Sequence, residues 1–189
     1  MSAQDSKLFV ISGPSGAGKG TLVTRVRERR SNLGLTVSAT TRAPRKGEVD
    51  GVNYFFLTRE EFDRRVANGE FVEWAEVHGN CYGTLVGEVQ SKLASGSSLI
   101  LEIDVQGALQ VKERFPEAVL IFIKPPSLEV LRERLVGRGT ETPETIELRM
   151  ANAADELALA DRYDDVVVND DLDRATDELV RVLDMHERI

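Results

Sequence analysis

The sequence predicts an α/β fold with a mostly parallel central sheet. Short apolar segments alternate with segments of helical period along nearly the whole chain, which is typical of strands connected by covering helices. A glycine-rich segment, residues 13–20, separates the first apolar segment from the first helical one. The 189 residues, 41% hydrophobic and 30% charged, suffice for one domain with a sizeable core.

The first predicted strand, residues 8–11, leads into a predicted phosphate-binding loop. The strand is apolar without alternation, and Leu22, Val23 and Val26 follow the loop at helical spacing. Glycines between a strand and a helix let backbone N–H groups approach a polyanion at the helix N-terminus, and Lys19 adds a charge for the terminal phosphates. A glycine-rich turn without a ligand is the weaker alternative. The predicted loop consists of Gly13, Pro14, Ser15, Gly16, Ala17, Gly18, Lys19, Gly20 and Thr21.

Residues from about 38 to 90 are expected to form an insertion of short strands and helices. The expected order is a strand at 35–40, a loop at 41–51, a strand at 54–57, a helix from Thr58 to about 68, a strand at 71–77, a turn at 79–84 and a helix at 85–95. Arg42, Arg45 and Lys46 make the first loop basic, with a solvated surface loop as the alternative. Alternation along 71–77 puts Glu73 on the less polar face with Phe71, where a carboxylate needs a partner or a ligand.

The apolar run 98–104 returns to the main sheet and ends in Glu102 and Asp104. Acids at the carboxyl end of a buried strand lie where open α/β sheets bind ligands, and in phosphate-loop enzymes they commonly lie near magnesium. An ordinary strand terminus is the alternative. A helix at 105–114 and a strand at 118–123 are expected next.

The C-terminal third predicts a pair of helices rich in arginine. Ser127 caps the first helix, and Thr142 and Pro143 are a typical cap and first position of the second, which runs to about residue 160. Arg134, Arg138 and Arg149 frame a hinged hairpin suited to closing over charge, with plain surface arginines as the alternative. A last strand at 166–168, then Asn169, precede a final amphipathic helix.

Composition excludes several function classes. The net charge of -8 argues against non-specific nucleic-acid binding. Neither a signal segment nor a membrane-spanning run is present, so a cytoplasmic protein without membrane contact is expected. One cysteine, Cys81, and two histidines leave no basis for a disulfide or for a cysteine- or histidine-based metal centre. The sequence carries no signal for an oligomeric state.

The predicted features together favour phosphoryl transfer between two bound anions. A phosphate loop, acids at a strand end, a basic insertion and an arginine hairpin provide two anion sites and a cover, whereas hydrolysis needs neither the second basic site nor the closing arginines. Such a reaction requires in-line positioning, charge screening and exclusion of water.

Nearly the whole chain resembles guanylate kinase. The segments that carry the resemblance are residues 13–21, 38–48, 71–75, 82–84, 101–107 and 137–140. The resemblance implies a three-layer P-loop kinase fold with a core (1–37, 91–133 and 153–189), an inserted GMP-binding lobe (about 38–90) and a helical lid (about 134–152). It also implies ATP-dependent conversion of GMP, and also of dGMP, to GDP for purine nucleotide metabolism, with Mg²⁺ as the cofactor.

The resemblance also implies roles for individual residues. The ATP site comprises the loop from Gly13 to Thr21 together with Asn169 near the base. The residues that bind GMP are Ser38, Arg42, Arg45, Tyr54, Glu73, Tyr82, Thr84 and Asp104, and the catalytic cations are Lys19, Arg42, Arg134, Arg138 and Arg149. Guanine fits this set, because Glu73 can accept from N1–H and the exocyclic amine while Thr84 donates to O6; adenine would leave Glu73 unpaired.

Two residues depart from the family pattern near the metal. Gly20 stands where many members have a serine whose hydroxyl holds magnesium, so the metal is expected to be held through phosphate oxygens and water. Glu102 stands where aspartate is more common; no direct metal ligand is predicted, and Glu102 is a candidate for contact through water.

Two other functions compete with this prediction. The first is a guanylate kinase-like module that binds peptides without catalysis, which would be expected to lose the lysine loop or the lid arginines. The second is a kinase of the same architecture that acts on a phosphorylated ribose, which would not need Glu73, Thr84 and Asp104.

Overall fold

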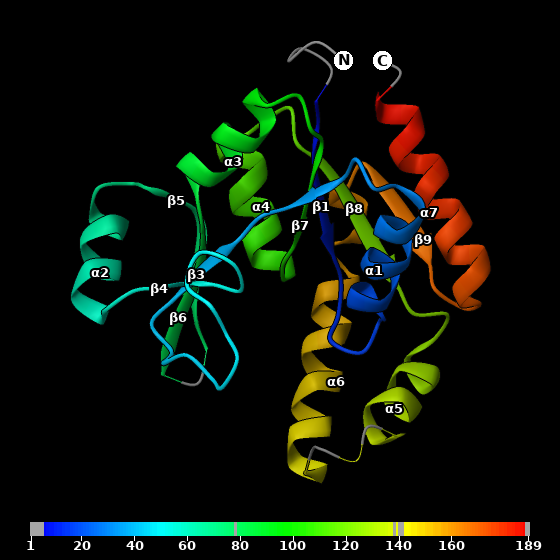
Figure 1. Ribbon diagram of the computed structural model, residues 1–189. Coiled ribbons are helices and arrows are strands. Elements are labelled where there is room, and N and C mark those ends of the chain that lie inside the picture. Colours follow the sequence, from blue (N-terminus) through cyan, green and yellow to red (C-terminus); the bar gives the residue numbers. More distant parts are fainter. Residues whose placement is uncertain (1–5, 78, 138, 140–141, 188–189) are drawn as a thin grey trace.

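A five-stranded parallel sheet forms the centre of the molecule (Figure 1). The structure is a computed structural model that describes residues 6–77, 79–137, 139 and 142–187. The strand order is β2 (Gly34–Leu35), β7 (Leu99–Glu102), β1 (Leu8–Ser12), β8 (Val119–Lys124) and β9 (Asp165–Val168), with parallel pairing throughout. The predicted α/β class and parallel sheet are confirmed.

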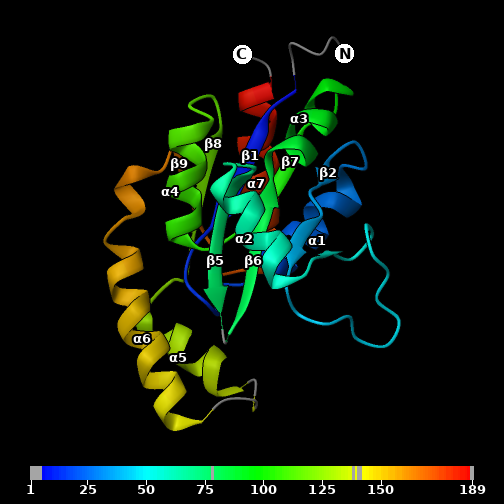
Figure 2. The same ribbon diagram turned by 90° about the vertical axis from the view of Figure 1, so that its left-hand side faces the viewer.

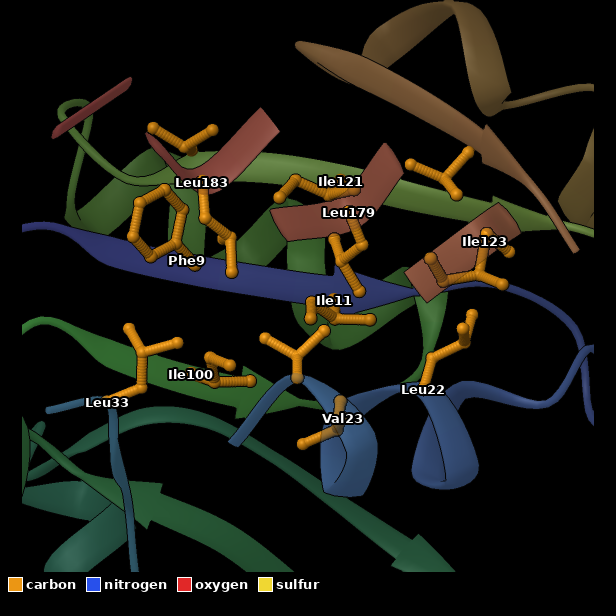
Figure 3. Close-up of a cluster of buried hydrophobic side chains, with 14 of the residues drawn as sticks. Phe9, Ile11, Leu22, Val23, Leu33, Ile100, Ile121, Ile123, Leu179 and Leu183 are labelled. Carbon is orange, nitrogen blue, oxygen red and sulfur yellow. The ribbon is translucent and has the colours of Figure 1, made fainter. Parts of the chain in front are cut away.

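Two helices cover one face of this sheet. They are α1 (Lys19–Arg29) and α7 (Leu172–Glu187), the first and last helices of the chain. Their apolar stripes pack on strand side chains such as Ile11 and Ile121, which are fully buried (Figure 3). This packing removes a large apolar area from water and fixes the start of α1 at the carboxyl end of β1.

The opposite face is covered by α4 (Val105–Arg114) and α3 (Val86–Ala94). Val105, Ala108 and Val111 of α4 recur at helical spacing and are buried on the sheet, which is why the sequence predicted this helix at its observed bounds. The short 3₁₀ helix η1 (Ala160–Arg162) leads into β9, and Tyr163 beside it packs edge-on against Phe122 at a centroid distance of 5.0 Å.

A second sheet forms a separate lobe at the side of the core (Figure 1). Its strand order is β4 (Phe55–Phe56), β3 (Ser38–Thr40), β6 (Asn80–Leu85) and β5 (Phe71–Val77). Helix α2 (Arg59–Ala67) lies beside it and is capped by Thr58, whose hydroxyl accepts a hydrogen bond from the N–H of Glu61 at 3.1 Å. Phe62 of α2 stacks on Phe71 of β5, so the lobe has a small core of its own.

The structure corrects two predictions in this lobe. The strand predicted at residues 35–40 is two strands, because β2 belongs to the central sheet and β3 to the second sheet. The segment predicted as a turn at 79–84 is mostly the strand β6, which lies between β3 and β5 and pairs with both. Neighbours on both sides thus stabilise a strand that local propensity does not favour.

Two helices extend beyond the end of the sheet and include most of the segment predicted as the lid (Figures 1 and 2). They are α5 (Leu128–Gly137) and α6 (Pro143–Leu157), and Ser127 and Thr142 accept hydrogen bonds from the helix N–H groups at their starts, as predicted. Leu131 and Leu135 of α5 pack against Ile146 of α6, so the two helices form one unit.

None of the helices in the described part of the chain has the length and apolar character needed to span a bilayer.

Candidate functional site

The glycine-rich loop runs from the carboxyl end of β1 to the first turn of α1. Gly13, Gly16 and Gly18 have φ angles of 142°, 93° and 91°, which are costly for residues with a side chain. At Gly13 a Cβ atom would lie 2.2 Å from the carbonyl oxygen of Ile123, and at Gly16 it would lie 2.9 Å from Leu131 Cδ1 of the lid. The glycines are therefore required both by the backbone and by close neighbours.

Lys19 extends from the start of α1 over this loop. Its Nζ donates hydrogen bonds to the backbone carbonyls of Gly13, at 2.5 Å, and Pro14, at 3.1 Å. The ammonium group therefore lies inside the curve of the loop, next to the N-terminus of α1. A phosphate bound there would meet both the lysine and the positive end of the helix dipole.

Glu102 and Gly20 lie opposite each other at this end of the sheet. A Cβ atom on Gly20 would lie 3.4 Å from Glu102 Oε1. Partial burial raises the pKa of Glu102, and the nearby Lys19 ammonium counteracts this rise. A carboxylate next to the phosphate loop, with open space instead of a hydroxyl at position 20, suits a magnesium ion held through water and phosphate oxygens.

Asn169 and Arg134 border the other side of the loop. Asn169 is buried and donates from Nδ2 to the carbonyl of Ala17 at 2.8 Å, while Arg134 donates to the carbonyl of Asn169 at 2.8 Å. A hollow of about 320 Å³ opens here, lined by Gly16, Gly18, Thr21, Arg134, Asn169, Asp170 and Leu172. The two predicted residues thus meet in one hollow next to the loop.

The lid reaches the loop through a second arginine. Arg149 of α6 donates a hydrogen bond to Ser15 Oγ, although the two residues are 134 positions apart in sequence. Arg134 also donates to the carbonyl of Ala17 at 3.5 Å, so both arginines contact the loop. Arg138, the third arginine predicted for the lid, lies outside the described residues.

The basic loop of the lobe is organised around Arg42. Its guanidinium pairs with Glu48 Oε1 at 2.8 Å and lies over the ring of Tyr54, 5.3 Å from its centroid. Glu48 Oε2 also accepts from the backbone N–H of Arg45 at 2.7 Å, and these contacts lower the pKa of Glu48. Sequence reasoning assigned no role to Glu48; its signal is an acid that follows two arginines within a tight loop.

The other predicted lobe residues lie on neighbouring strands. Tyr82 of β6 packs edge-on to Tyr54, with their ring centroids 6.3 Å apart. Ser38 of β3 pairs in register with Thr84 of β6. Side chains that are far apart in sequence are thus collected on one sheet.

Glu73 is buried next to two of the predicted guanine contacts. Its Oε1 accepts a hydrogen bond from Thr84 Oγ1 at 2.7 Å, and burial raises its pKa to about 7, with the negative charge of Asp104 contributing. Asp104 caps α4 and accepts from the N–H of Gly107 at 2.7 Å. A Cβ on Gly107 would lie 3.3 Å from both Asp104 Oδ1 and Glu73 Oε2, so the two carboxylates meet above this glycine.

A β-bulge sets the direction of Glu73, and the sequence did not predict it. The register of β5 against β6 shifts between Phe71 and Glu73, so that Glu73 no longer shares the face of Phe71. Phe71 packs on α2, whereas Glu73 reaches α4 of the core. The prediction that both lie on one face is wrong, but the expectation that the carboxylate has a partner is confirmed.

Metal ligation by protein side chains alone finds no support in the described segments. No group of three or more histidine, cysteine, aspartate or glutamate side chains lies close enough to hold an ion there. Cys81 is fully buried in the lobe core, and burial raises the pKa of its thiol. It is therefore an inert core residue.

Comparisons with known proteins identify the family of this chain. The family model described as guanylate kinase matches residues 5–186. The chain is 57% identical to a guanylate kinase of Gloeobacter violaceus over 178 residues, which cover 94% of this chain and 87% of that protein. It is 52% identical to one of Halalkalibacterium halodurans over 183 residues, or 97% of this chain and 90% of that protein.

A solved structure has the same architecture. The crystal structure of guanylate kinase from Anaplasma phagocytophilum aligns with a TM-score of 0.73 at 37% sequence identity, covering 96% of this chain and 86% of that one. The aligned structure and the family model each cover nearly the whole chain. The chain belongs to the guanylate kinase family.

Proposed function

We infer that this protein is a guanylate kinase that transfers the terminal phosphoryl group of ATP to GMP and releases ADP and GDP. The single observation that carries the choice of acceptor is the buried Glu73–Thr84 hydrogen bond beside Asp104. The family membership supports both the reaction and the two substrates.

The donor half of the site is the loop with its surroundings. We assign the ATP phosphates to the loop from Gly13 to Thr21 and to Lys19, because backbone N–H groups, helix dipole and ammonium all favour a polyanion at this point. The base of ATP is assigned to the hollow beside Asn169 and Arg134, which is adjacent to the loop.

The acceptor half is the lobe. Arginine grips phosphate through two parallel hydrogen bonds, so we assign the GMP phosphate to the basic loop and the aromatic hydroxyls beside it. These residues are Ser38, Arg42, Arg45, Tyr54 and Tyr82. The guanine base would meet Glu73, Thr84 and Asp104, and because none of these contacts involves the ribose 2′-hydroxyl, dGMP is accepted too.

Magnesium is the proposed cofactor, bound together with ATP. Glu102 would hold it through water, and phosphate oxygens would supply other ligands, because Gly20 provides no hydroxyl. The ion would screen the negative charge of the transferred group.

The remaining cations of the site screen the same charge. Lys19 and Arg149 contact the loop directly, and Arg42 lies on the acceptor side. Arg134 donates to the carbonyl of Ala17 in the loop and to that of Asn169 beside it. The lid excludes water when it closes over both nucleotides, so that GMP and not water receives the phosphoryl group.

We propose a division into a core, a GMP-binding lobe at about 38–90 and a lid at about 134–152. The second sheet and the helical hairpin support these bounds. ATP and GMP are nucleotides of the cell interior, and we propose a cytoplasmic enzyme on that ground.

The test is release of ADP from ATP and magnesium in the presence of GMP, dGMP, AMP, UMP or ribose phosphates. High activity is expected only with GMP and dGMP. The rate of ADP release with AMP is expected to be lower by about a thousandfold, because adenine leaves Glu73 unpaired. Activity with none of the acceptors would favour a binding module, and activity with ribose phosphates alone would favour the other kinase.

A further inference from the structure

The chain crosses between the central sheet and the lobe at two places. Residues 36–37 link β2 to β3, and α3 with residues 95–98 links β6 to β7. Most of the proposed GMP ligands lie on the lobe side of these crossings, whereas Lys19 lies on the core side. How the crossings are held therefore bears on the distance between the donor phosphate and its acceptor.

Two side chains of α3 connect the second crossing to the first. Glu88 Oε1 accepts a hydrogen bond from the backbone N–H of Val37 at 3.1 Å, and Lys92 Nζ donates to the backbone carbonyl of Leu35 at 2.6 Å. Glu88 and Lys92 lie one helical turn apart and pair with each other at 2.7 Å. We call these two residues the crossing clip, because together they hold both ends of residues 36–37.

Packing alone does not fix the first crossing. Thr36 and Val37 are only half-buried, and they border a hollow of about 650 Å³ that also touches Val52 and Lys92. Charge-assisted hydrogen bonds from a partly buried carboxylate and a lysine are stronger than neutral ones. The clip therefore adds side-chain attachments to residues 35–37, between the backbone pairing of β2 with β7 on one side and that of β3 with β6 on the other.

We propose that Glu88 and Lys92 are positioning residues for GMP, acting through the backbone of residues 35–37 and touching neither substrate. The lobe also attaches to the core by packing, through Val72 of β5 on the α4 face. The clip holds the backbone of residues 35–37, and Ser38 follows directly after this segment. This inference rests on the proposed function.

The first test is steady-state kinetics of Glu88→Ala and Lys92→Met with each substrate varied. The KM for GMP is expected to rise by about fivefold to tenfold, as when a charge-assisted hydrogen bond that biases a conformation is lost, while the KM for ATP changes by less than about twofold. Unchanged KM values for GMP in both variants would overturn the proposal, and so would equal rises for both substrates.

A charge swap separates the clip from ordinary helix stabilisation. Glu88→Lys combined with Lys92→Glu keeps an ion pair one turn apart on α3, but it places a donor against the N–H of Val37 and an acceptor against the carbonyl of Leu35. The double variant is expected to show a raised KM for GMP like the single variants. Restoration of wild-type kinetics by the swap would reduce the pair to a helix ion pair and overturn the positioning role.

Hydrogen exchange at the Val37 amide tests the contact independently of catalysis. In Glu88→Ala this amide is expected to exchange at least about tenfold faster than in the wild type, whereas buried amides of β1 keep their rates. An unchanged Val37 rate would overturn the clip even in an active enzyme. Conversely, a wild-type protein inactive on GMP would refute the proposed function while the exchange experiment still decides the contact.

Discussion

Glu73 combines two demands that conflict at neutral pH. Burial raises its pKa to about 7 from an ordinary value of 4.5, so that without ligand a large share of the side chain is protonated at pH 7. Because the folded state binds this proton more tightly than the unfolded state, Glu73 adds most to the free energy of unfolding below its ordinary pKa of 4.5. This contribution is lost as pH rises through about 7. In the proposed site, however, guanine presents two donors to Glu73, and accepting from both requires the carboxylate.

We therefore predict that the KM for GMP falls as pH rises from about 6 to about 8, because the bound base selects ionised Glu73. The measurement is the pH profile of the KM for GMP, compared with that for ATP. ATP makes no contact with this carboxylate in the proposed site, so its profile should lack the change near pH 7.

Glu73→Gln provides the control for this profile. The variant should raise the KM for GMP by at least about a hundredfold, because an amide cannot accept from both guanine donors. Its profile should keep only the change near pH 6 that belongs to the GMP phosphate. An identical step near pH 7 in the variant would assign the ionisation to another group.

In the proposed site, Gly20 offers the magnesium ion no hydroxyl ligand. A Cβ atom there would touch Glu102 at 3.4 Å, which is an ordinary contact, so a side chain of one or two heavy atoms fits. We predict that Gly20→Ser lowers the magnesium concentration for half-maximal activity several-fold, by adding a hydroxyl ligand.

Gly20→Ala is the matched control for the serine variant. It adds the same Cβ without the oxygen, so the magnesium dependence should stay as in the wild type. Both variants should raise the free energy of unfolding by about 0.5 to 1 kcal/mol, because alanine and serine lose less backbone entropy than glycine in a helix. A lower magnesium requirement in the alanine variant would show that the hydroxyl is not responsible.

At the scale of elements, the proposed lid contacts the glycine-rich loop through two residues. Arg149 contacts Ser15, and Leu131 lies against Gly16, so α5 and α6 rest on the phosphate loop itself. We predict that Arg149→Met lowers kcat by about a hundredfold or more while the KM for ATP changes a few-fold, because the role proposed for this arginine is to stabilise charge that develops in the transition state.

Arg132 offers a control within the same lid. It lies on α5, is partly exposed, and pairs with Glu147 of α6 through hydrogen bonds of 2.5 and 2.8 Å. Exposed ion pairs contribute little, so Arg132→Met should leave kcat within about twofold of the wild type. Equal losses in both variants, measured at saturating ATP and GMP, would point to general damage of the lid.

Elements with strong local signals were predictable, and elements defined by distant neighbours were not. Helix α4 begins at its cap Asp104 and carries a clear apolar stripe, and its predicted bounds are those observed. Strand β6 has weak local signals; at Gly83 a Cβ would lie 2.7 Å from the carbonyl oxygen of Glu73, so only the paired strand explains its glycine. No local pattern distinguishes the two sheets that share residues 34–40.

The same distinction applies to the site residues. The glycine-rich loop and Lys19 could be predicted because the motif and the helix that follows it are contiguous in the sequence. The direction of Glu73 depends on a bulge against β6, and the partnership of Glu48 with Arg42 depends on a loop conformation. Side-chain alternation assumes an unbroken strand, so it could not locate either feature.

At the scale of the whole molecule, the lobe has a core that is separate from those of the central sheet. Phe62, Phe71, Ala39 and Cys81 form the buried lobe cluster, while both faces of the parallel sheet carry larger clusters. A small core tolerates less loss of buried apolar contacts than a large one, because the free energy of unfolding is only a small difference between large terms.

We therefore predict that Phe62→Ala abolishes GMP binding while ATP binding persists. The substitution removes a fully buried ring that stacks on Phe71 at 4.3 Å, and such losses cost about 3 to 5 kcal/mol. Calorimetric titration of each nucleotide measures the two affinities. Trp74, the single tryptophan, lies 6.3 Å from the Phe62 ring, so its fluorescence should report unfolding of the lobe below the main transition.

Phe122→Ala is the matched substitution in the central sheet. Phe122 is also fully buried, but it belongs to the cluster beneath α4 and lies in β8 next to the strand that leads into the phosphate loop. This variant should weaken both nucleotides together and lower the main thermal transition, without a separate change in Trp74 fluorescence. If Phe62→Ala instead weakens ATP and GMP equally, the lobe and the core unfold as one unit, and selection of the acceptor is not separable from binding of the donor.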